Sequence, residues 1–277
     1  MIPAAFEYRR VGTADEAVAS LTELGDEAKL LAGGHSLLPL MKLRLASPSV
    51  LIDLGRVRDL SYVRDAGDHV AIGALTRHYD VQHNELLQSA VPVLPHVAGQ
   101  VGDPQVRHRG TIGGSIAHGD PASDLPAAVL ALGGSLVAQG PSGTRVIPAA
   151  SFFRGFLETA LGPDEVLTEV RVPKMDGAGW SFQKFNRRAQ DWAIVGVVAV
   201  GPAAGGGVAL VNMASTPVRA AAVERAVAGG ASPAEAAASA SEGLDPPSDL
   251  NASPEFRRHL ASVLTRRALE EVAARRS

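Results

Sequence analysis

The chain of 277 residues contains no cysteine, and this absence excludes several kinds of chemistry. Without a thiol it can hold no disulfide, no thiolate nucleophile, no cysteine-ligated zinc and no iron–sulfur cluster of its own. The eight histidines are scattered, and neither His78 with His83 nor His108 with His118 has a convincing metal-ligand spacing. A metal centre within this chain is therefore not expected.

A strong charge of one sign and long apolar runs are also missing. Basic and acidic residues nearly balance, and the formal net charge of −3 gives no electrostatic basis for binding nucleic acid. No apolar run approaches the ~20 residues that span a bilayer. The first ten residues lack an apolar signal core. A cytoplasmic location is the expectation, with peripheral association at the inner face of the membrane left open.

Aromatic residues are scarce, at 4% of the chain, so an aromatic side chain near a glycine-rich loop stands out. The hydrophobic content of 46% with 20% charged residues is typical of a globular protein. The length allows a sizeable core and favours two domains.

Two short segments with paired glycines are the most informative features that are present. Paired glycines admit positive φ angles and close approach of another group, and successive bare N–H groups form concave sites for phosphates. Neither segment has the Rossmann or the Walker pattern. We expect the two to hold one diphosphate from two sides, and two tight turns without a ligand are the alternative. The first segment comprises Ala32, Gly33, Gly34, His35 and Ser36, and the second comprises Thr111, Ile112, Gly113, Gly114 and Ser115.

Hydrophobic periodicity and capping residues predict an α+β organisation. A helix capped by Thr13 precedes a strand at Lys29–Ala32, a short helix at Ser36–Leu45 and a strand at Val50–Asp53. The next elements expected are strands within Leu60–Leu75, helices at Thr76–Ser89, Val93–Val101 and Pro121–Leu132, a hairpin at Gly133–Pro148, and the segment Val166–Val172.

The pattern changes after Pro173. Three strands are expected as a meander, at Trp180–Arg187, Ala193–Val200 and Val208–Met213. Alanine-rich helices follow, one of them opened by a capping box at Ser232–Glu235, and a last amphipathic helix starts near Pro254. A domain boundary near Met175–Ala178 is expected.

Several polar residues admit two interpretations. His35 is either a catalytic or covalently linked imidazole or simply a loop residue that forms hydrogen bonds. A hydrogen-bonding role is the commoner one for a polar loop histidine. Asp120 and Asp124 either cap a helix or accept hydrogen bonds from sugar-like hydroxyls. Trp192, which follows Arg187 and Arg188, belongs to a surface hairpin or stacks against a flat ring.

At these residues the chain resembles the FAD-binding medium subunits of the carbon monoxide dehydrogenase and xanthine dehydrogenase family. The resemblance covers essentially the whole chain, including residues 256–260. Its most specific stretches are Ala32–Ala46, Thr111–Pro126, Pro163–Pro173 and Phe182–Arg188.

The resemblance implies a fold of the vanillyl-alcohol-oxidase type. Residues 1–176 would form the FAD-binding domain, with subdomains at about 1–55 and 56–176. Residues 177–277 would form a C-terminal domain with a three-stranded antiparallel sheet and helices.

The resemblance also implies a non-covalent FAD and a set of contacts to it. The two glycine segments surround the pyrophosphate, and Asp124 contacts the hydroxyls of the cofactor. The backbone of Leu167 contacts the flavin ring, Lys184 borders the cofactor, and Trp192 lies beside the isoalloxazine. Ser115 and His118 stand where many relatives have asparagine. No residue of this chain is expected to be catalytic or to bind a metal.

The implied function is electron transfer within a larger enzyme. A large subunit with a molybdenum cofactor oxidises the substrate, and a small subunit with two [2Fe–2S] clusters passes electrons to this flavin, which delivers them to an external acceptor. The implied assembly is a dimer of heterotrimers. Two alternatives are a self-sufficient FAD-dependent oxidase, for which the sequence offers no acid or base, and an FAD-free assembly subunit, against which the intact glycines argue.

Overall fold

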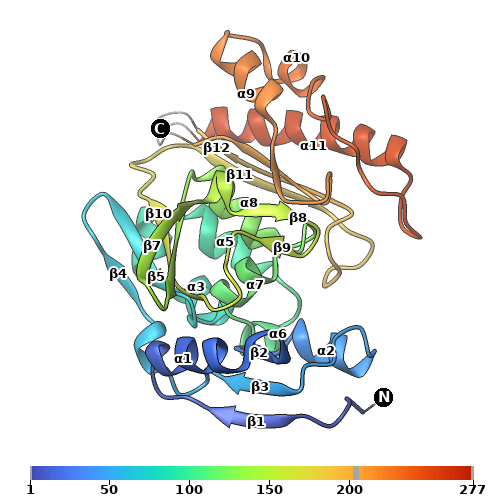
Figure 1. Ribbon diagram of the computed structural model, residues 1–277. Helices are drawn as coiled ribbons and strands as arrows, with labels where there is room; N and C mark the ends of the chain where they lie inside the picture. The colour runs from blue at the N-terminus through green and yellow to red at the C-terminus, as the bar shows by residue number, and fades with distance from the viewer. Residues whose placement is uncertain (1, 202–205, 276–277) are drawn as a thin grey trace.

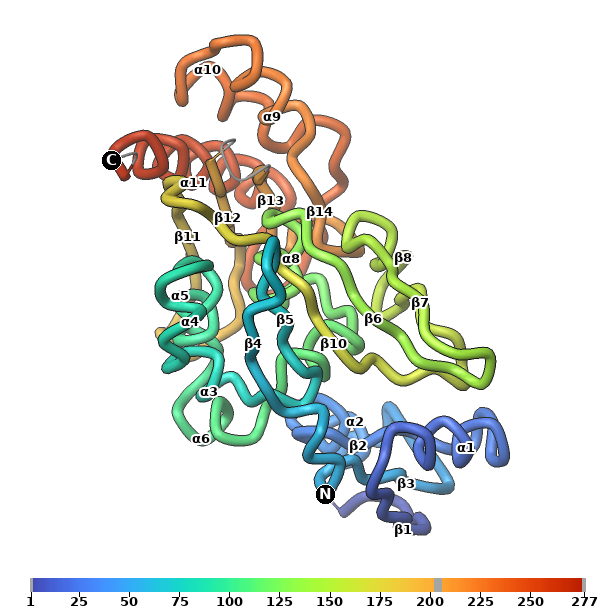
Figure 2. Tube along the Cα trace, turned by 90° about the vertical axis from the view of Figure 1, so that its left-hand side faces the viewer, coloured from blue at the N-terminus to red at the C-terminus, as the bar shows by residue number. Residues whose placement is uncertain are grey.

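The computed structural model describes residues 2–201 and 206–275, and these residues form a chain of three packed units (Figure 1). The N-terminal unit lies at one end and the C-terminal helices lie at the other, as Figure 2 shows from the side. In the described ranges no helix combines the length and the apolar character needed to cross a membrane.

The N-terminal unit is a small parallel sheet with two helices. The hydroxyl of Thr13 accepts a hydrogen bond from the Glu16 N–H at 3.1 Å, which confirms the predicted cap. The Glu16 carboxylate bonds the N–H of Gly12 at 2.6 Å. The strands pair in the order β1-β3-β2. The elements are β1 (Glu7–Arg10), α1 (Ala14–Leu24), β2 (Ala28–Leu31), α2 (Leu37–Lys42) and β3 (Val50–Asp53), with a 3-10 turn at Gly25–Glu27.

The middle unit is a five-stranded antiparallel sheet in the order β4-β5-β10-β6-β7, covered on one face by helices. Its strands are β4 (Val63–Asp65), β5 (His69–Gly73), β6 (Ser135–Gly140), β7 (Gly143–Pro148) and β10 (Val166–Pro173). A separate short hairpin consists of β8 (Phe153–Gly155) and β9 (Glu158–Thr159). Two 3-10 turns occur at Arg58–Leu60 and Ala149–Ser151.

Six short helices connect β5 to β6, where fewer and longer ones were expected. The predicted helix at Thr76–Ser89 is broken because Asn84 caps a new helix, its side chain accepting from the Leu87 N–H at 3.1 Å. The helix expected from Pro121 begins only at Asp124. The helices are α3 (His78–His83), α4 (Glu85–Ala90), α5 (Val93–Gly99), α6 (Pro104–Arg107), α7 (Ile112–His118) and α8 (Asp124–Ala131).

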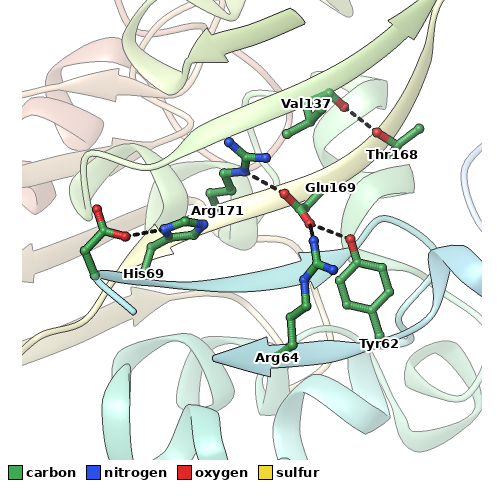
Figure 3. A network of polar contacts seen from close by, with 8 residues as sticks. Tyr62, Arg64, His69, Val137, Thr168, Glu169 and Arg171 are labelled. Atoms are coloured by element: carbon green, nitrogen blue, oxygen red, sulfur yellow. Dashed lines mark hydrogen bonds and ion pairs between the residues drawn. The ribbon is translucent and has the colours of Figure 1, made fainter. Parts of the chain in front are cut away.

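The outer face of the five-stranded sheet carries a polar network centred on Glu169 of β10 (Figure 3). Its carboxylate accepts from the Tyr62 hydroxyl at 2.5 Å, from Arg64 at 2.8 Å and from Arg171 at 2.6 Å. Gly73 stands opposite Glu169 on the intervening strand, and a Cβ there would lie 2.9 Å from the Tyr62 ring. Because Gly73 has no side chain, Tyr62 and Arg64 can reach Glu169 of β10 across β5.

The network shifts the pKa values of its members in opposite directions. Burial and the bond to Glu169 raise the pKa of Tyr62 to about 12. Burial alone would raise the pKa of Glu169, but its bonds from Tyr62 and Arg171 outweigh that effect and lower it. Glu169 therefore stays ionised as the common acceptor of three donors.

The C-terminal unit is an antiparallel sheet buried on both faces. Along β12, Val198 and Val200 join the core shared with the middle unit, while Val195 and Val197 join a second core under α11. This explains the uninterrupted apolar sequence of β12. The elements are β11 (Trp180–Phe185), β12 (Val195–Val200), β13 (Val208–Val211), β14 (Val218–Arg219), α9 (Ala221–Ala228), α10 (Pro233–Ala237) and α11 (Pro254–Ala274).

This sheet has four strands, so the expectation of three was wrong. The fourth strand, β14, has only two residues and pairs Val218 and Arg219 with Leu210 and Ala209 of β13. A two-residue strand leaves no alternating pattern in the sequence, which is why it was missed. The predicted capping box at Ser232 is confirmed, since both of its reciprocal bonds to Glu235 are present.

Candidate functional site

A cavity of about 780 Å³ opens where the N-terminal unit meets the middle unit, and both glycine segments line it. The first segment enters from the end of β2 and the second from the start of α7. Side chains from α8, β10 and β11, and the loop that follows β11, complete the wall. A volume of this size is typical of a site for a large organic ligand.

The first glycine segment presents unused backbone donors to this cavity. Gly34 adopts a φ of +78°, which favours glycine, and turns the chain from β2 into α2. Among the described residues, the backbone N–H groups of Gly33, Gly34, His35 and Ser36 donate no hydrogen bond. Consecutive free N–H groups in such a turn form a concave anion site, as the sequence predicts.

Gly33 brings the two segments together. A Cβ at this position would overlap the carbonyl oxygen of Arg109 and lie 2.8 Å from the Cα of Gly110. The backbone of the first segment therefore packs directly on the residues that precede the second, which only glycine permits. Ala32 extends this contact, because its Cβ lies 3.8 Å from the place where a Cβ on Gly114 would stand.

The second glycine segment is the first turn of α7 and differs from the turn with bare N–H groups that was expected. The hydroxyl of Thr111 caps the helix by accepting from the Gly114 N–H at 3.1 Å. The N–H groups of Ile112, Gly113 and Ser115 bond to the carbonyl oxygens of Thr76, Ala74 and Thr111. The protein itself uses all four donors, two of them on the segment that follows β5 and two on Thr111. This segment therefore offers hydroxyls and a bare glycine wall in place of a row of free N–H groups.

The two glycines of this segment have different surroundings. A Cβ on Gly113 would lie 2.6 Å from the backbone oxygen of Ala74, so Gly113 is required for packing α7 beside β5. A Cβ on Gly114 would meet only the Thr111 hydroxyl within 3 Å. Gly114 lines the cavity, and its missing side chain leaves room there.

A buried ion pair lies in the cavity wall. The Nζ of Lys184, on β11, is 2.7 Å from Oδ2 of Asp124, the first residue of α8, and each side chain is only 5% exposed. Lys184 also donates to the Gln100 carbonyl oxygen at 3.1 Å. Burial raises the pKa of Asp124 to about 6, although Lys184 acts in the opposite direction. The other oxygen, Oδ1, is buried without a hydrogen-bond partner in the described structure.

His78 also lines the cavity, although it was not among the predicted site residues. It is almost fully buried at the start of α3, and its Nε2 lies 3.1 Å from the hydroxyl oxygen of Ser115. Burial, with smaller contributions from His35 and Arg107, lowers its pKa to about 4, so the ring is neutral at physiological pH. Nothing in the local pattern around His78 marks it, because its partner is 37 positions away.

Comparison with known proteins assigns this arrangement to a family. Residues 4–175 match the family described as the FAD binding domain in molybdopterin dehydrogenase, and residues 180–272 match the CO dehydrogenase flavoprotein C-terminal domain. The chain belongs to this flavoprotein family. It is an FAD-dependent oxidoreductase subunit, as the resemblance implied.

Individual relatives match the flavoprotein over its whole length. The carbon monoxide dehydrogenase medium chain of Hydrogenophaga pseudoflava is 41% identical, covering 99% of each chain. The glyceraldehyde dehydrogenase medium chain of Sulfolobus acidocaldarius is 37% identical, covering 99% of this chain and all of the relative. The structure of the Hydrogenophaga pseudoflava carbon monoxide dehydrogenase that lacks the Mo-pyranopterin moiety superposes with a TM-score of 0.96 and 41% identity, covering 100% of both chains.

The flavoprotein brings nearly all of its predicted site residues to the one cavity. Asp124, Leu167, Lys184 and Trp192 line it together with both glycine segments. Ile112 is the exception, because its side chain is fully buried in the hydrophobic core. Trp192 is 57% exposed, so it borders the cavity without being fixed by close packing.

The residues present fit FAD. A row of free N–H groups suits the diphosphate, the bare wall at Gly114 allows close approach, and Oδ1 of Asp124 lacks a donor that a sugar or ribityl hydroxyl would supply. Across residues 2–201 and 206–275 there is no group of three His, Asp or Glu side chains that could hold a metal ion. Leu157 and Thr159, from the β8–β9 hairpin, also line the cavity and were not among the predicted site residues.

Proposed function

We propose that this flavoprotein is the electron-transfer subunit of a molybdenum-containing hydroxylase or dehydrogenase. It takes electrons from iron–sulfur clusters of a partner subunit and passes them to an external acceptor. The cavity carries this proposal, because free backbone donors, a bare glycine wall and an unpaired carboxylate oxygen converge there in a chain of an FAD-binding family. The lack of cysteine requires that any such clusters reside in another chain.

The two glycine segments hold the pyrophosphate of FAD in different ways. The N–H groups of residues 33–36 donate to the phosphate oxygens, with His35 as a non-covalent neighbour. Gly114 allows the phosphates to approach α7, and the hydroxyls of Thr111 and Ser115 are the polar groups of that wall. This division follows because the N–H groups of the second segment already have partners within the protein.

The remaining contacts orient the rest of the cofactor. Oδ1 of Asp124 accepts from cofactor hydroxyls, while Lys184 neutralises the carboxylate and fixes its direction through Oδ2. The backbone of Leu167, beside the irregular pairing of β10 with β6, contacts the flavin ring, and Trp192 lies at its edge. Bound FAD supplies the redox chemistry, and the protein supplies position and electrostatics. Electron relay requires no general base, so no residue here is assigned as catalytic.

The proposal divides the chain into two domains. Residues 1–176 bind FAD, with subdomains of about 1–55 and 56–176, and residues 177–277 form the C-terminal domain. The ranges of the two family matches, 4–175 and 180–272, support this division. Lys184 links the domains, since it is on the C-terminal sheet and pairs with Asp124 of the FAD-binding domain.

The full assembly is a dimer of heterotrimers. Each trimer contains this chain, a large subunit with the molybdenum cofactor and a small subunit with two [2Fe–2S] clusters. The assembly works in the cytoplasm, with peripheral contact to the inner face of the membrane. The named relatives act on carbon monoxide and on glyceraldehyde, so the substrate varies within the family and is read by the large subunit. Mass measurement of the co-expressed complex and cell fractionation test these points.

An absorption spectrum of the purified chain tests the proposed function first. We expect the two visible bands of bound flavin, one FAD per chain, and no substrate oxidation until the partner subunits are added. A chain that oxidises a substrate alone would indicate a self-sufficient oxidase. A colourless chain that cannot be reconstituted with FAD would overturn the proposal and favour an assembly subunit.

A further inference from the structure

A second cavity, of about 700 Å³, lies next to the one assigned to FAD. It opens between the loop before α8, the segment before α11 and the loop from β11 to β12. Asp191 and Trp192 line both cavities, so the β11–β12 loop is their common wall. A ligand in the second cavity would therefore share these two side chains with the ligand of the first cavity.

The tip of the β8–β9 hairpin also divides the two cavities. Phe156 lines the second cavity, and its neighbour Leu157 lines the first. Leu157 has a φ of +57°, which is uncommon for a residue with a side chain. The hairpin tip and the Trp192 loop thus border the same pair of cavities.

Two exposed aromatic side chains distinguish the second cavity. Phe156 is 67% exposed and Trp192 is 57% exposed, in a chain with only 4% aromatic residues. An aromatic side chain left in water forgoes the favourable free energy that its burial would supply. Two such side chains at the border of one cavity are suited to stack on the faces of a flat ring. The two side chains therefore indicate a planar ligand.

The polar lining determines which charge and which hydrogen-bond acceptors the ligand should have. Arg257 is fully buried in the cavity wall, and its Nη2 pairs with Asp249 at 2.7 Å. Its Nε–H is buried and has no partner in the described structure, so it is a donor that awaits an acceptor. Arg188 pairs with Asp191 at 3.0 Å. A guanidinium N–H donor favours a ligand that presents a carbonyl oxygen, an imine nitrogen or a phenolate oxygen as the acceptor.

The acidic residues of the lining exclude a polyanion. Four aspartates face three arginines around the cavity, so the lining has no excess positive charge. A dinucleotide with two phosphates would meet unfavourable electrostatics there. A flat ring that is neutral or carries one negative charge meets no such penalty. The aspartates are Asp120, Asp191, Asp245 and Asp249, and the arginines are Arg187, Arg188 and Arg257.

We propose that the second cavity binds the terminal electron acceptor, a planar conjugated ring with carbonyl or imine groups, between Phe156 and Trp192. This inference rests on the proposed function. In the transfer, reduced FAD returns to its oxidised form and releases two electrons and two protons. The acceptor takes them up at two C=O or C=N ends, which become O–H or N–H groups. The common wall of the two cavities keeps donor and acceptor adjacent during this exchange.

Reoxidation of the reduced flavin by two acceptors of different shape tests the inference. The FAD-loaded full chain is reduced with one equivalent of dithionite without oxygen. It is then mixed with 2,6-dichlorophenolindophenol, a flat ring dye, or with ferricyanide, a compact inorganic ion. For Phe156→Ala we expect the second-order rate constant with the dye to fall about tenfold, from lost stacking and burial, with ferricyanide unchanged.

Two further variants sharpen the experiment. Ser215→Trp places a large side chain on an exposed lining residue and should reduce the dye rate at least tenfold by filling the cavity. Phe6→Ala removes an exposed aromatic in the N-terminal unit and should change neither rate. Both leave the residues assigned to FAD intact, so bound FAD should stay at one per chain.

The outcomes separate the inference from the proposed function. Equal dye rates in Phe156→Ala and the parent protein, with normal FAD content, would overturn the acceptor site and leave the electron-transfer role intact. A parallel loss with both acceptors would also overturn it, because the residue would then act on the flavin. Failure to retain FAD, or no reoxidation by either acceptor in the parent protein, would instead contradict the proposed function.

Discussion

The imidazole of His78 and the hydroxyl of Ser115 form a hydrogen bond in the wall of the FAD cavity, with Nε2 and Oγ 3.1 Å apart. The other ring nitrogen, Nδ1, is buried without a partner in the described structure. A buried N–H without an acceptor is rarer in proteins than an unpaired acceptor. This assigns the proton to Nε2, which donates to Ser115 and leaves the hydroxyl hydrogen of Ser115 available to the cavity.

The stability of the chain should depend on pH through His78. Its folded pKa is about 4, whereas histidine in the unfolded chain titrates near 6.5. Between these values only the unfolded chain binds the proton, so the free energy of unfolding falls as pH drops from 6.5 to 4, by up to about 3 kcal/mol. Urea unfolding of the FAD-free chain should show this loss relative to His78→Gln, whose amide does not titrate. Parallel pH curves for the two proteins would contradict the expectation.

The ion pair between Asp124 and Lys184 should contribute to stability, and this contribution should be larger at high pH than at low pH. Lys184→Met leaves the carboxylate buried without its partner, which should lower the free energy of unfolding by about 3 kcal/mol at pH 7.5. The loss should shrink at pH 5, because protonation of Asp124 removes the unpaired charge. Combining Lys184→Met with Asp124→Asn should recover part of the stability at pH 7.5. A loss that is the same at both pH values would show that the pair acts through packing alone.

In the parent protein the same carboxylate contributes a pH effect of its own. Its folded pKa is about 6 and its ordinary value is 3.8. Between these values the folded chain holds a proton that the unfolded chain has released, so the free energy of unfolding decreases as pH rises from 4 to 6, by up to about 3 kcal/mol. This slope opposes that of His78, which is why each residue must be tested against its own non-titrating variant.

The sequence could predict those elements whose pattern is local. The predictable features are the cap at Thr13, the glycine segments, three of the four strands of the C-terminal sheet and the start of α11 near Pro254, which all depend on neighbouring residues. The strand β1 was missed because Glu7–Arg10 is polar and mostly exposed, and its main contact is backbone pairing with β3. No local pattern encodes a partner strand that is more than forty residues away.

The same limit applied to the site. Glycine pairs indicated an anion site, and the resemblance named Asp124 and Lys184. Their direct contact across 60 positions, and that of His78 with Ser115, depend on how β11 and α3 pack against the helices. The sequence could not show which segment keeps its N–H groups free, because both segments contain Gly-Gly. The difference comes from the cap at Thr111 and from the carbonyl oxygens of Ala74 and Thr76, which accept the N–H groups of the second segment.

The two glycines of α7 should respond differently to the same substitution. Gly114→Val places its side chain against the Thr111 hydroxyl and into the cavity, so FAD affinity should fall at least about a hundredfold. The fold should persist, with a loss of about 1 kcal/mol from the disturbed cap. Gly113→Val meets the backbone of Ala74 and should prevent folding. Thr111→Val, which removes the cap without filling the cavity, is the control for stability. Stoichiometric FAD in Gly114→Val would show that this turn is not at the diphosphate.

Gly33 should be required for both stability and FAD binding, because it is where the N-terminal unit packs on the segment before α7. In Gly33→Ala the new Cβ overlaps the Arg109 carbonyl and lies 2.8 Å from the Cα of Gly110. Neither backbone atom can rotate away, so the two glycine segments must separate, at a cost of about 1–3 kcal/mol. Separation also removes the free N–H groups of residues 33–36 from the opposite wall, and the FAD dissociation constant should rise at least about tenfold.

The matched control for this prediction is Gly67→Ala, in the turn between β4 and β5. Gly67 has a φ of +92°, and a Cβ there would meet nothing within 4 Å, so the substitution adds backbone strain of about 1 kcal/mol without moving any packed surface. Urea unfolding and quenching of FAD fluorescence on titration measure the two effects separately. Both variants should lose stability, and only Gly33→Ala should lose FAD affinity. If Gly33→Ala and Gly67→Ala bound FAD equally well, the contact between the glycine segments would matter for the fold alone. FAD binding would then not depend on the present distance between the two segments.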